Sequence, residues 1–244
     1  MKVFFRAGVS LAAALLCACS TYPTVDEAKD EFKATFRKMP VDRVEKSELP
    51  GLYEVYSGGK LFYFAPEQKL MLFGEMYTTA GQSLTQAKVG QYISERTLNI
   101  PQDVGVTVGD GPVEVTGFLD PDCGHCAQAH DWLEKRDYSG VKLRVVFLPL
   151  QPGSMSYARA QQFVCSPPEL RREALREVYS HEDPAPGRHF LTCAGGAAQL
   201  AKQADLAKEL GIEGTPTFVA KGQTVLGFNR ERLEALLTTT SSTN

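Results

Sequence analysis

The stretch Cys123-Gly124-His125-Cys126 constrains this chain more than any other. It follows the apolar run Val113 to Leu119 and leads into a helical pattern that extends to Lys135. The two cysteines therefore sit where a strand is expected to turn into a helix. A helix N-terminus carries partial positive charge and unpaired N–H groups, so a thiol placed there ionises more readily, and the thiolate is the reactive form.

The two cysteines are expected to differ in role. Cys123, the first of the pair, is predicted to be the exposed nucleophile. Cys126, one helical turn further on, can attack a mixed disulfide and release the bound partner. Zinc binding is the alternative, but one CxxC supplies half of a zinc site, and Cys165 and Cys193 do not form a second one. The sequence favours thiol chemistry with no metal and no other cofactor.

The composition is that of an ordinary globular protein. Hydrophobic residues make up 43% of the chain and charged residues 23%, which argues against wholesale disorder. The net charge of −3 gives no indication of nucleic-acid binding. The length of 244 residues suffices for one large domain or two small ones.

Residues 1–18 have the pattern of an export signal. Lys2 and Arg6 supply a basic start, and the apolar run Ala7 to Leu16 is too short to span a bilayer comfortably. The run ends in a segment that resembles the acylation box of bacterial lipoproteins, with Cys19 as the acylated residue. We therefore expect a periplasmic protein with a lipid anchor, and the residue after Cys19 favours the outer membrane. Ordinary signal cleavage, leaving an unanchored protein, is the alternative.

Export changes what the six cysteines imply. Cys17 is removed with the signal and Cys19 is blocked by lipid, which leaves four cysteines in an oxidising compartment. An even number there divides most simply into one redox-active pair and one structural pair.

Residues 19–83 are predicted to form a small α+β domain. Thr24 and Glu27 form a capping box, and the helix that follows is predicted to end at Pro40. Its apolar stripe consists of Val25, Ala28, Phe32, Phe36 and Met39.

A β-hairpin is predicted next, because Leu52 to Ser57 and Lys60 to Phe64 flank Gly58-Gly59, the signature of a two-residue turn. Leu70 to Phe73 adds another strand. A unit this small has a limited core, so we interpret it as a dimerisation module. A domain that stands without a partner is the alternative.

Residues 84–105 are predicted to be a partly helical linker, and residues 106–244 a second domain. The order of elements in that domain is β–α–β, a helical insert, then β–β–α, which is typical of a thioredoxin-like α/β domain with an added helical segment. The predicted elements are strand Val113–Leu119, helix Cys123–Lys135, strand Lys142–Leu148, strands Thr217–Ala220 and Thr224–Phe228, and helix Arg230–Leu237. Ser154 to about Leu210 is predicted to be mostly helical, with interruptions at Pro167-Pro168 and at Asp183 to Gly187.

Gly214-Thr215-Pro216-Thr217 is the second informative stretch. A proline at a strand start is tolerated only at an edge or in special backbone geometry, and X–Pro is the linkage where a cis bond is accessible. Given the cysteine pair, we predict a cis bond before Pro216, with the backbone of Thr215 facing the cysteines. An extended substrate can then pair with Thr215 as an added strand. An ordinary trans turn is the alternative.

Taken together, these features resemble the bacterial periplasmic disulfide isomerases of the DsbC/DsbG type. The matching pieces are Gly51-Leu52-Tyr53-Glu54-Val55, Gly58-Gly59, Cys123-Gly124-His125-Cys126, His130 and Gly214-Thr215-Pro216.

The resemblance implies a thiol:disulfide interchange enzyme, in which Cys123 attacks a wrong disulfide and the freed substrate thiol finds a better partner. It also implies a V-shaped homodimer whose cleft holds misfolded exported proteins, and a membrane reductant of the DsbD type that keeps the pair reduced. A structural disulfide between Cys165 and Cys193 follows from the same resemblance.

The Gly124-His125 dipeptide departs from the Gly-Tyr or Pro-Tyr of the best-known members. A histidine there is predicted to lie near the Cys123 thiolate and favour the reduced form, with simple exposure of His125 as the alternative. Gly117 stands where thioredoxin buries an acidic residue, and His130 is interpreted as a packed helix residue. Two other functions stay open: a reductase of oxidised single cysteines or net oxidase, and a chaperone-like binding module.

Overall fold

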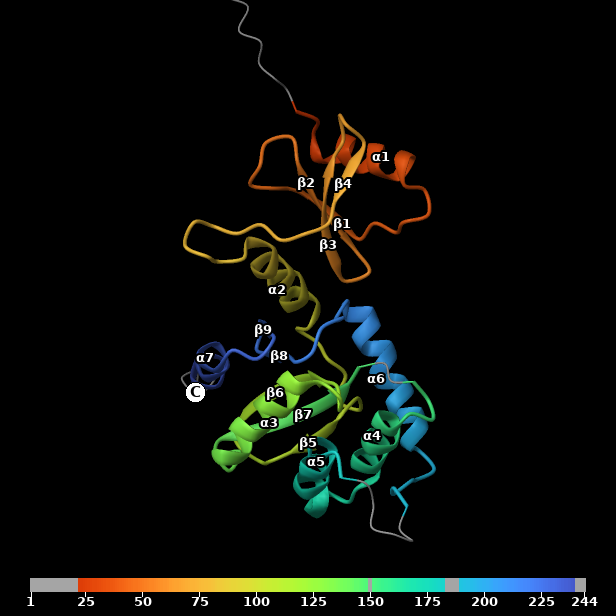
Figure 1. Cartoon of the computed structure of the whole chain (residues 1–244), viewed down its shortest axis with the longest axis vertical. Coiled ribbons are helices and arrows are strands. Elements are labelled where there is room, and N and C mark those ends of the chain that lie inside the picture. The colour runs from red at the N-terminus through yellow and green to blue at the C-terminus, as the bar shows by residue number, and fades with distance from the viewer. Residues whose placement is uncertain (1–21, 149–150, 183–188, 240–244) are drawn as a thin grey trace, which may run out of the picture.

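The computed structural model describes residues 22–148, 151–182 and 189–239 (Figure 1). Two sheets lie one above the other, with helix α2 (Leu84–Arg96) between them. The predicted signal and Cys19 lie outside the described residues. Within the described ranges, no helix combines the length and the apolar character that crossing a membrane requires.

The first helix, α1 (Val25–Thr35), begins at the predicted capping box. The backbone N–H of Thr24 donates to the Glu27 carboxylate at 2.7 Å, and the Thr24 side chain accepts from the Glu27 N–H. The prediction that the helix continues to Pro40 is wrong. The chain leaves the helix at Phe36, and Phe36 and Met39 pack on the same core from a turn, which prolongs the apolar stripe beyond the helix.

The N-terminal sheet has the order β1-β2-β3-β4, with all neighbours antiparallel. Its strands are β1 (Arg43–Lys46), β2 (Tyr53–Ser57), β3 (Lys60–Ala65) and β4 (Leu70–Leu72). The predicted hairpin is confirmed, and Gly58 and Gly59 both have positive φ, at 57° and 86°. Strand β1 was not predicted, because it contains one apolar residue and so shows no alternating pattern.

The apolar residues of this domain divide into two groups. Those in the core against α1 are almost fully buried; they are Ala28, Phe32, Val44, Tyr53, Val55, Phe62 and Phe64. Leu70 and Leu72 of the edge strand β4 are instead 64% and 55% exposed, and the adjacent Phe73 is 68% exposed. The domain thus fills its small core and still presents apolar side chains along one sheet edge.

Helix α2 is more than the predicted linker, because it contributes to the second domain's core. Ile93 and Val104 are buried in one cluster with Phe118 and Val146 of the second sheet. Ser94 Oγ also lies 2.8 Å from Thr224 Oγ1. Helix α2 and the residues after it therefore pack against the second domain as well as linking it to the first.

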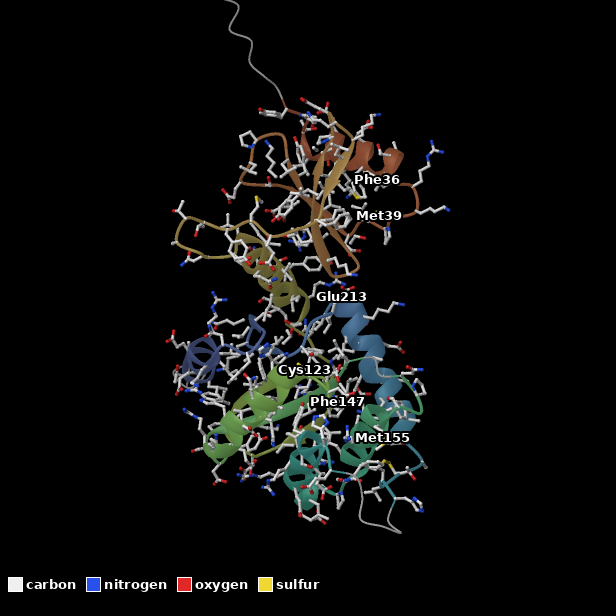
Figure 2. All side chains as sticks on the ribbon, viewed as in Figure 1. Phe36, Met39, Cys123, Phe147, Met155 and Glu213 are labelled. Atoms are coloured by element: carbon white, nitrogen blue, oxygen red, sulfur yellow. A yellow bond between two sulfur atoms is a disulfide. The ribbon has the colours of Figure 1, made fainter. Side chains whose placement is uncertain are left out.

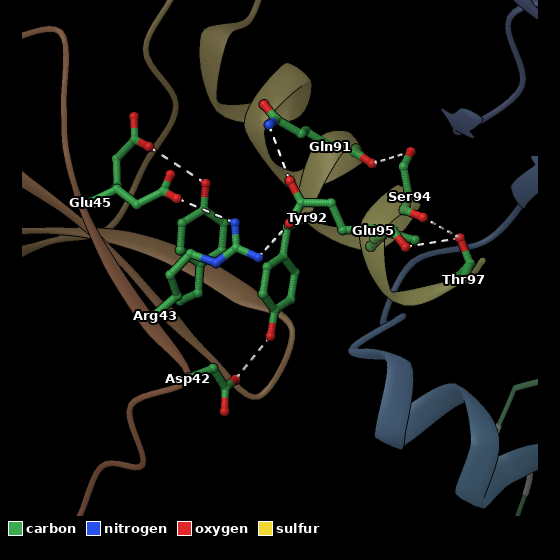
Figure 3. Close-up of polar contacts among 12 residues, drawn as sticks. Asp42, Arg43, Glu45, Gln91, Tyr92, Ser94, Glu95 and Thr97 are labelled. Atoms are coloured by element: carbon green, nitrogen blue, oxygen red, sulfur yellow. Dashed lines mark hydrogen bonds and ion pairs between the residues drawn. The ribbon is translucent and has the colours of Figure 1, made fainter. Parts of the chain in front are cut away.

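The same helix is tied to the N-terminal sheet through Arg43 (Figure 3). Its guanidinium donates to Glu95 of α2 at 2.5 Å and to Glu45 at 3.2 Å, and lies over the rings of Tyr56 and Tyr92. A second contact joins the domains at the hairpin turn, where a Cβ on Gly59 would lie 2.2 Å from the carbonyl oxygen of Gly211.

The second sheet has the order β5-β7-β6-β8-β9, in which only the β6–β7 pair is parallel. Its strands are β5 (Val106–Val108), β6 (Val113–Leu119), β7 (Val141–Phe147), β8 (Thr217–Ala220) and β9 (Gln223–Leu226). The prediction that Val113 opens the first strand is wrong. Strand β5 precedes it, and with three residues it is too short for a periodic pattern to reveal.

In the described part of this domain there are six helical segments. They are α3 (Gly124–Lys135), α4 (Met155–Cys165), the 3₁₀ helix Pro168–Leu170, α5 (Arg171–Ser180), α6 (Gly196–Leu210) and α7 (Arg230–Thr239). The insert that carries α4, α5 and α6 follows β7, and a disulfide between Cys165 and Cys193 links the end of α4 to the segment before α6. The observed order is the predicted thioredoxin-like plan with its helical addition.

Candidate active site

Cys123 occupies the N-cap position of α3, four residues after the end of strand β6 at Leu119. Its Sγ lies 3.4 Å from the backbone N–H of Cys126, which donates to it. Cys123 is partly exposed, and both Cys123 and Cys126 are free thiols in this structure. Figure 2 places Cys123 at the end of α3 that faces α2 and the N-terminal domain.

Pro216 follows a cis peptide bond, as the sequence predicts. The carbonyl oxygen of the preceding residue, Thr215, accepts a hydrogen bond from the Cys123 thiol at 3.5 Å. The two informative stretches of the sequence thus meet, with the Cys123 sulfur beside the Thr215 carbonyl.

The surroundings lower the pKa of Cys123. Partial burial acts to raise it, but hydrogen bonds from the Thr215 side chain, from Cys126 and from the His125 backbone N–H together outweigh that effect. Because these contacts favour the charged form, Cys123 carries more thiolate at neutral pH than an unperturbed cysteine.

Cys126 has the opposite environment. Its side chain has no exposed surface, and burial raises the pKa of its thiol well above the usual range. It lies in the main core of the domain. The pair therefore combines a reactive outer sulfur with a protonated inner one.

Gly124 and His125, predicted to tune the pair, are both exposed. A Cβ on Gly124 would meet no atom within 4 Å, so the position is open rather than crowded. His125 reaches Cys123 through its backbone N–H. An electrostatic role for its imidazole stays a prediction.

A polar network beside Cys123 was not predicted from the sequence. The carboxylate of Asp122 accepts hydrogen bonds from Ser156 Oγ and, at 3.4 Å, from Arg159 Nη1, and Arg159 also lies 3.2 Å from His181 Nδ1. Ser156 and Arg159 come from α4, so the network ties the inserted helices to the residue that precedes the nucleophile. Its members are more than 30 residues from Asp122 in sequence, and no local motif joins them.

Three other residues singled out in the sequence are Cys165, Cys193 and His130. Cys165 and Cys193 are joined with an S–S distance of 2.07 Å and a Cα–Cα distance of 5.6 Å. His130 is buried on α3, with Nδ1 2.8 Å from the Tyr138 hydroxyl. Among the described residues, no group of three or more His, Cys, Asp or Glu side chains is arranged to hold a metal ion.

An open cavity of about 900 Å³ lies beside this site. Thr215 and Thr217 line it from the second domain, and α2 forms another wall. Glu75 and Tyr77, from the segment that connects β4 to α2, complete the rim. The cavity thus reaches Thr215, the residue beside Cys123, while the two cysteines themselves are not among its lining residues.

Comparison with known proteins agrees with this geometry. Residues 20–86 match the family model described as the disulfide bond isomerase protein N-terminal domain, and residues 100–240 match that of the thioredoxin-like domain. A protein of Bordetella parapertussis named "Probable thiol:disulfide interchange protein DsbC" is 27% identical over 228 residues, which cover 88% of this chain and 75% of that protein. A protein of the same name from Bordetella avium is 24% identical, with 83% and 70% covered.

Two solved structures show the same fold at low sequence identity. The catalytic domain of Proteus mirabilis ScsC has a TM-score of 0.51 at 18% identity, covering 63% of this chain and 98% of that one. The thiol-disulfide exchange protein alpha-DsbA2 from Wolbachia pipientis has a TM-score of 0.51 at 16% identity, covering 65% and 99%. The chain belongs to the thioredoxin-like family, in which it is a DsbC-like protein whose thioredoxin-like domain follows a disulfide bond isomerase N-terminal domain.

Proposed function

We propose that this protein is a thiol:disulfide oxidoreductase that rearranges non-native disulfides in exported proteins. The observation that carries the proposal is the contrast within the cysteine pair. Cys123 is partly exposed, has a lowered pKa and faces Thr215, whereas Cys126 is sealed in the core with a raised pKa. This division suits one sulfur to attack a substrate and the other to release it.

The chemistry begins with the Cys123 thiolate. It attacks one sulfur of a substrate disulfide, forming a mixed disulfide and expelling the other substrate sulfur as a thiolate. If a further substrate thiolate attacks the mixed disulfide, Cys123 is regenerated and the substrate disulfide has moved with no net change in oxidation. If Cys126 attacks instead, the substrate leaves reduced and a Cys123–Cys126 disulfide remains.

That second outcome requires an electron donor to restore the dithiol. By family resemblance we propose a membrane reductant of the DsbD type. A substrate segment is held in extended form, with its backbone paired to Thr215 beside Pro216. The cavity of about 900 Å³ lined by Thr215 supports this placement.

The N-terminal domain is proposed to join two copies of the chain. The match of residues 20–86 and the exposed Leu70, Leu72 and Phe73 at the β4 edge support this role. In a dimer, a substrate released from one Cys123 meets the second at high effective concentration, which favours the repeated encounters that reshuffling needs. We place the protein in the periplasm, anchored through a lipidated Cys19.

Two assays on the full chain test the proposal. Wild-type protein is expected to reactivate scrambled ribonuclease and to reduce insulin slowly, and Cys123→Ser to do neither. Fast insulin reduction without reactivation would identify a reductase. Protection of unfolded ribonuclease from aggregation that survives in Cys123→Ser, with no reactivation by wild type, would identify a binding module.

A further inference from the structure

Cys126 is buried, so solvent cannot take the proton from its thiol. It must lose its proton before it can attack a mixed disulfide, because the thiolate is the nucleophile. Its side chain has no exposed surface, and burial raises its pKa. Gly117 of β6 offers no carboxylate. A proton acceptor elsewhere in the core is therefore needed.

Two buried groups lie beside Cys126. His130 stands four residues after Cys126 on α3, so the two side chains are neighbours on one helix face, and both are buried. Tyr179 of α5 belongs to the same core cluster as Cys126. Its ring lies 5.2 Å from that of His130, at an interplanar angle of 30°.

The hydroxyl group of Tyr179 is buried and has no hydrogen-bond partner within the described part of the chain. A buried hydroxyl without a partner is costly, and an explanation is required where one occurs. Burial and, after it, the charge that Cys126 can carry raise the pKa of Tyr179, so the hydroxyl keeps its proton and can donate it in a hydrogen bond.

His130 is held ready to accept a proton. Its Nδ1 lies 2.8 Å from the Tyr138 hydroxyl, and a neutral imidazole that donates from Nδ1 keeps Nε2 as an acceptor. Burial lowers its pKa, which keeps the ring neutral at physiological pH. No step proposed for Cys123 uses this residue.

We propose that His130 takes the proton of Cys126 during substrate release, and that Tyr179 donates a hydrogen bond to the thiolate so formed. The proposal rests on the proposed function, since it concerns the second step of that exchange. The Cys126 S–H proton passes to Nε2, and the sulfur attacks Cys123 in the mixed disulfide. The Cys123–Cys126 bond forms as the bond to the substrate sulfur breaks. The substrate leaves as a thiolate, which the imidazolium proton then neutralises.

The charges around His130 are balanced. Glu134 of α3 pairs with Arg172 at 3.3 Å and with Arg176 at 2.7 Å, both from α5. Tyr138 and Tyr179 contact the His130 ring, and Cys126 lies one helical turn before it. The charged groups that act on its pKa are Asp131, Glu134, Arg172 and Arg176. Because the carboxylates raise its pKa and the arginines lower it, burial sets the direction of the shift.

A chromophoric aromatic disulfide, 5,5′-dithiobis(2-nitrobenzoate), separates the two steps in one stopped-flow trace. The first equivalent of thionitrobenzoate reports attack by Cys123, and the second reports attack by Cys126 on the mixed disulfide. In His130→Gln and in Tyr179→Phe we expect the first phase to match wild type at pH 7. The second phase is expected to slow by about a hundredfold or more in His130→Gln, the lower end of the range for general acid–base catalysis. In Tyr179→Phe, which removes one hydrogen-bond donor, it is expected to slow by about tenfold.

The pH profile distinguishes proton transfer from altered packing. The wild-type second phase is expected to rise through the pKa of His130, below about 6.5, and then to level off. In His130→Gln it is expected to rise about tenfold per pH unit into the alkaline range, since hydroxide then removes the proton. Loosened packing would instead expose Cys126 and speed the second phase at every pH.

The matched control is His189→Gln, which alters an exposed histidine outside the cluster. Tyr179→Phe keeps the ring, so its thermal unfolding is expected to resemble that of wild type. Second phases within twofold of wild type in both cluster variants, with first phases intact, would overturn the proposal. A missing first phase in the wild type would instead contradict the proposed function.

Discussion

The Sγ of Cys123 lies 3.5 Å from the carbonyl oxygen of Thr215, although the two residues are 92 positions apart in the chain. Strand β6 leads to the first, and strand β8, its antiparallel neighbour in the sheet, begins two residues after the second. The peptide bond that follows Thr215 is cis. Cys123 and Thr215, the proposed nucleophile and the proposed peptide-binding residue, thus lie at the same end of the sheet.

The first prediction concerns the pH dependence of alkylation. Because the pKa of Cys123 is lowered and that of Cys126 is raised, iodoacetamide is expected to label Cys123 alone at pH 7. The labelling rate should rise with pH to a midpoint below about 8.5, the value for an unperturbed thiol. Mass spectrometry of quenched samples measures it. A midpoint above that value, or equal labelling of Cys126, would contradict the assignment.

The sequence revealed the parts of this site that local chemistry dictates. A CxxC at a strand–helix junction predicts the Cys123 N-cap, and Gly58-Gly59 predicts the first domain's hairpin, because each depends on neighbouring residues. The position of Thr215 beside the cysteines can be predicted only when Pro216 and the CxxC are considered together.

What the sequence could not reveal depends on contacts between distant segments. Tyr179 reaches the core near Cys126 from the inserted α5, and Arg159 reaches Asp122 from α4, through packing that no local pattern encodes. The weak apolar stripe of α2 predicts only a partly helical linker, yet Ile93 is buried against the second sheet. A three-residue strand such as β5 carries too few positions for a period to be recognised.

The second prediction concerns the Cys165–Cys193 disulfide, which closes a loop across the inserted helices with a sequence separation of 28. On the chain-entropy model such a loop contributes about 3 to 4 kcal/mol. Replacing both cysteines with alanine is expected to lower the free energy of unfolding by that order, measured in urea. In the wild-type protein, Cys165 and Cys193 should also resist alkylation at a glutathione-like potential, because the disulfide leaves no free thiol. Labelling of Cys165 as fast as Cys123 would contradict a stable bond.

The third prediction concerns the first domain and its apolar edge. Leu70→Lys combined with Leu72→Lys places charge on the exposed β4 edge, which opposes pairing between strands. Sedimentation is expected to show a dimer for wild type and a monomer for the variant. Ribonuclease reactivation should fall about tenfold or more, while attack on a small aromatic disulfide stays unchanged.

A control substitution and a truncated protein complete that test. Leu98→Lys charges a side chain that is equally exposed, at 66%, but lies outside the edge, and it should change nothing. A chain beginning at Ser83 keeps α2 and its buried Ile93, and it should behave as a monomer that exchanges small disulfides. A wild type that sediments as a monomer, or a shortened chain that reactivates ribonuclease fully, would refute the dimer mechanism.

The fourth prediction concerns Cys19. A lipid chain partitions into a bilayer and a serine hydroxyl does not, so Cys19→Ser is expected to move the protein from the membrane fraction to the soluble periplasmic fraction. Metabolic labelling with a fatty acid should mark the wild type and miss the variant. Identical fractionation of the two would remove the lipoprotein interpretation.

The central claim is that Cys123 joins covalently to substrate proteins and Cys126 releases them. Cys126→Ser in the full chain tests it directly, because attack stays possible and release by the second sulfur does not. After incubation with scrambled ribonuclease and acid quenching, we expect mixed disulfides in which ribonuclease cysteines are attached at Cys123, mapped by mass spectrometry. Such adducts should be short-lived in wild type and absent in Cys123→Ser. No adduct in Cys126→Ser, or adducts at another cysteine, would contradict the account.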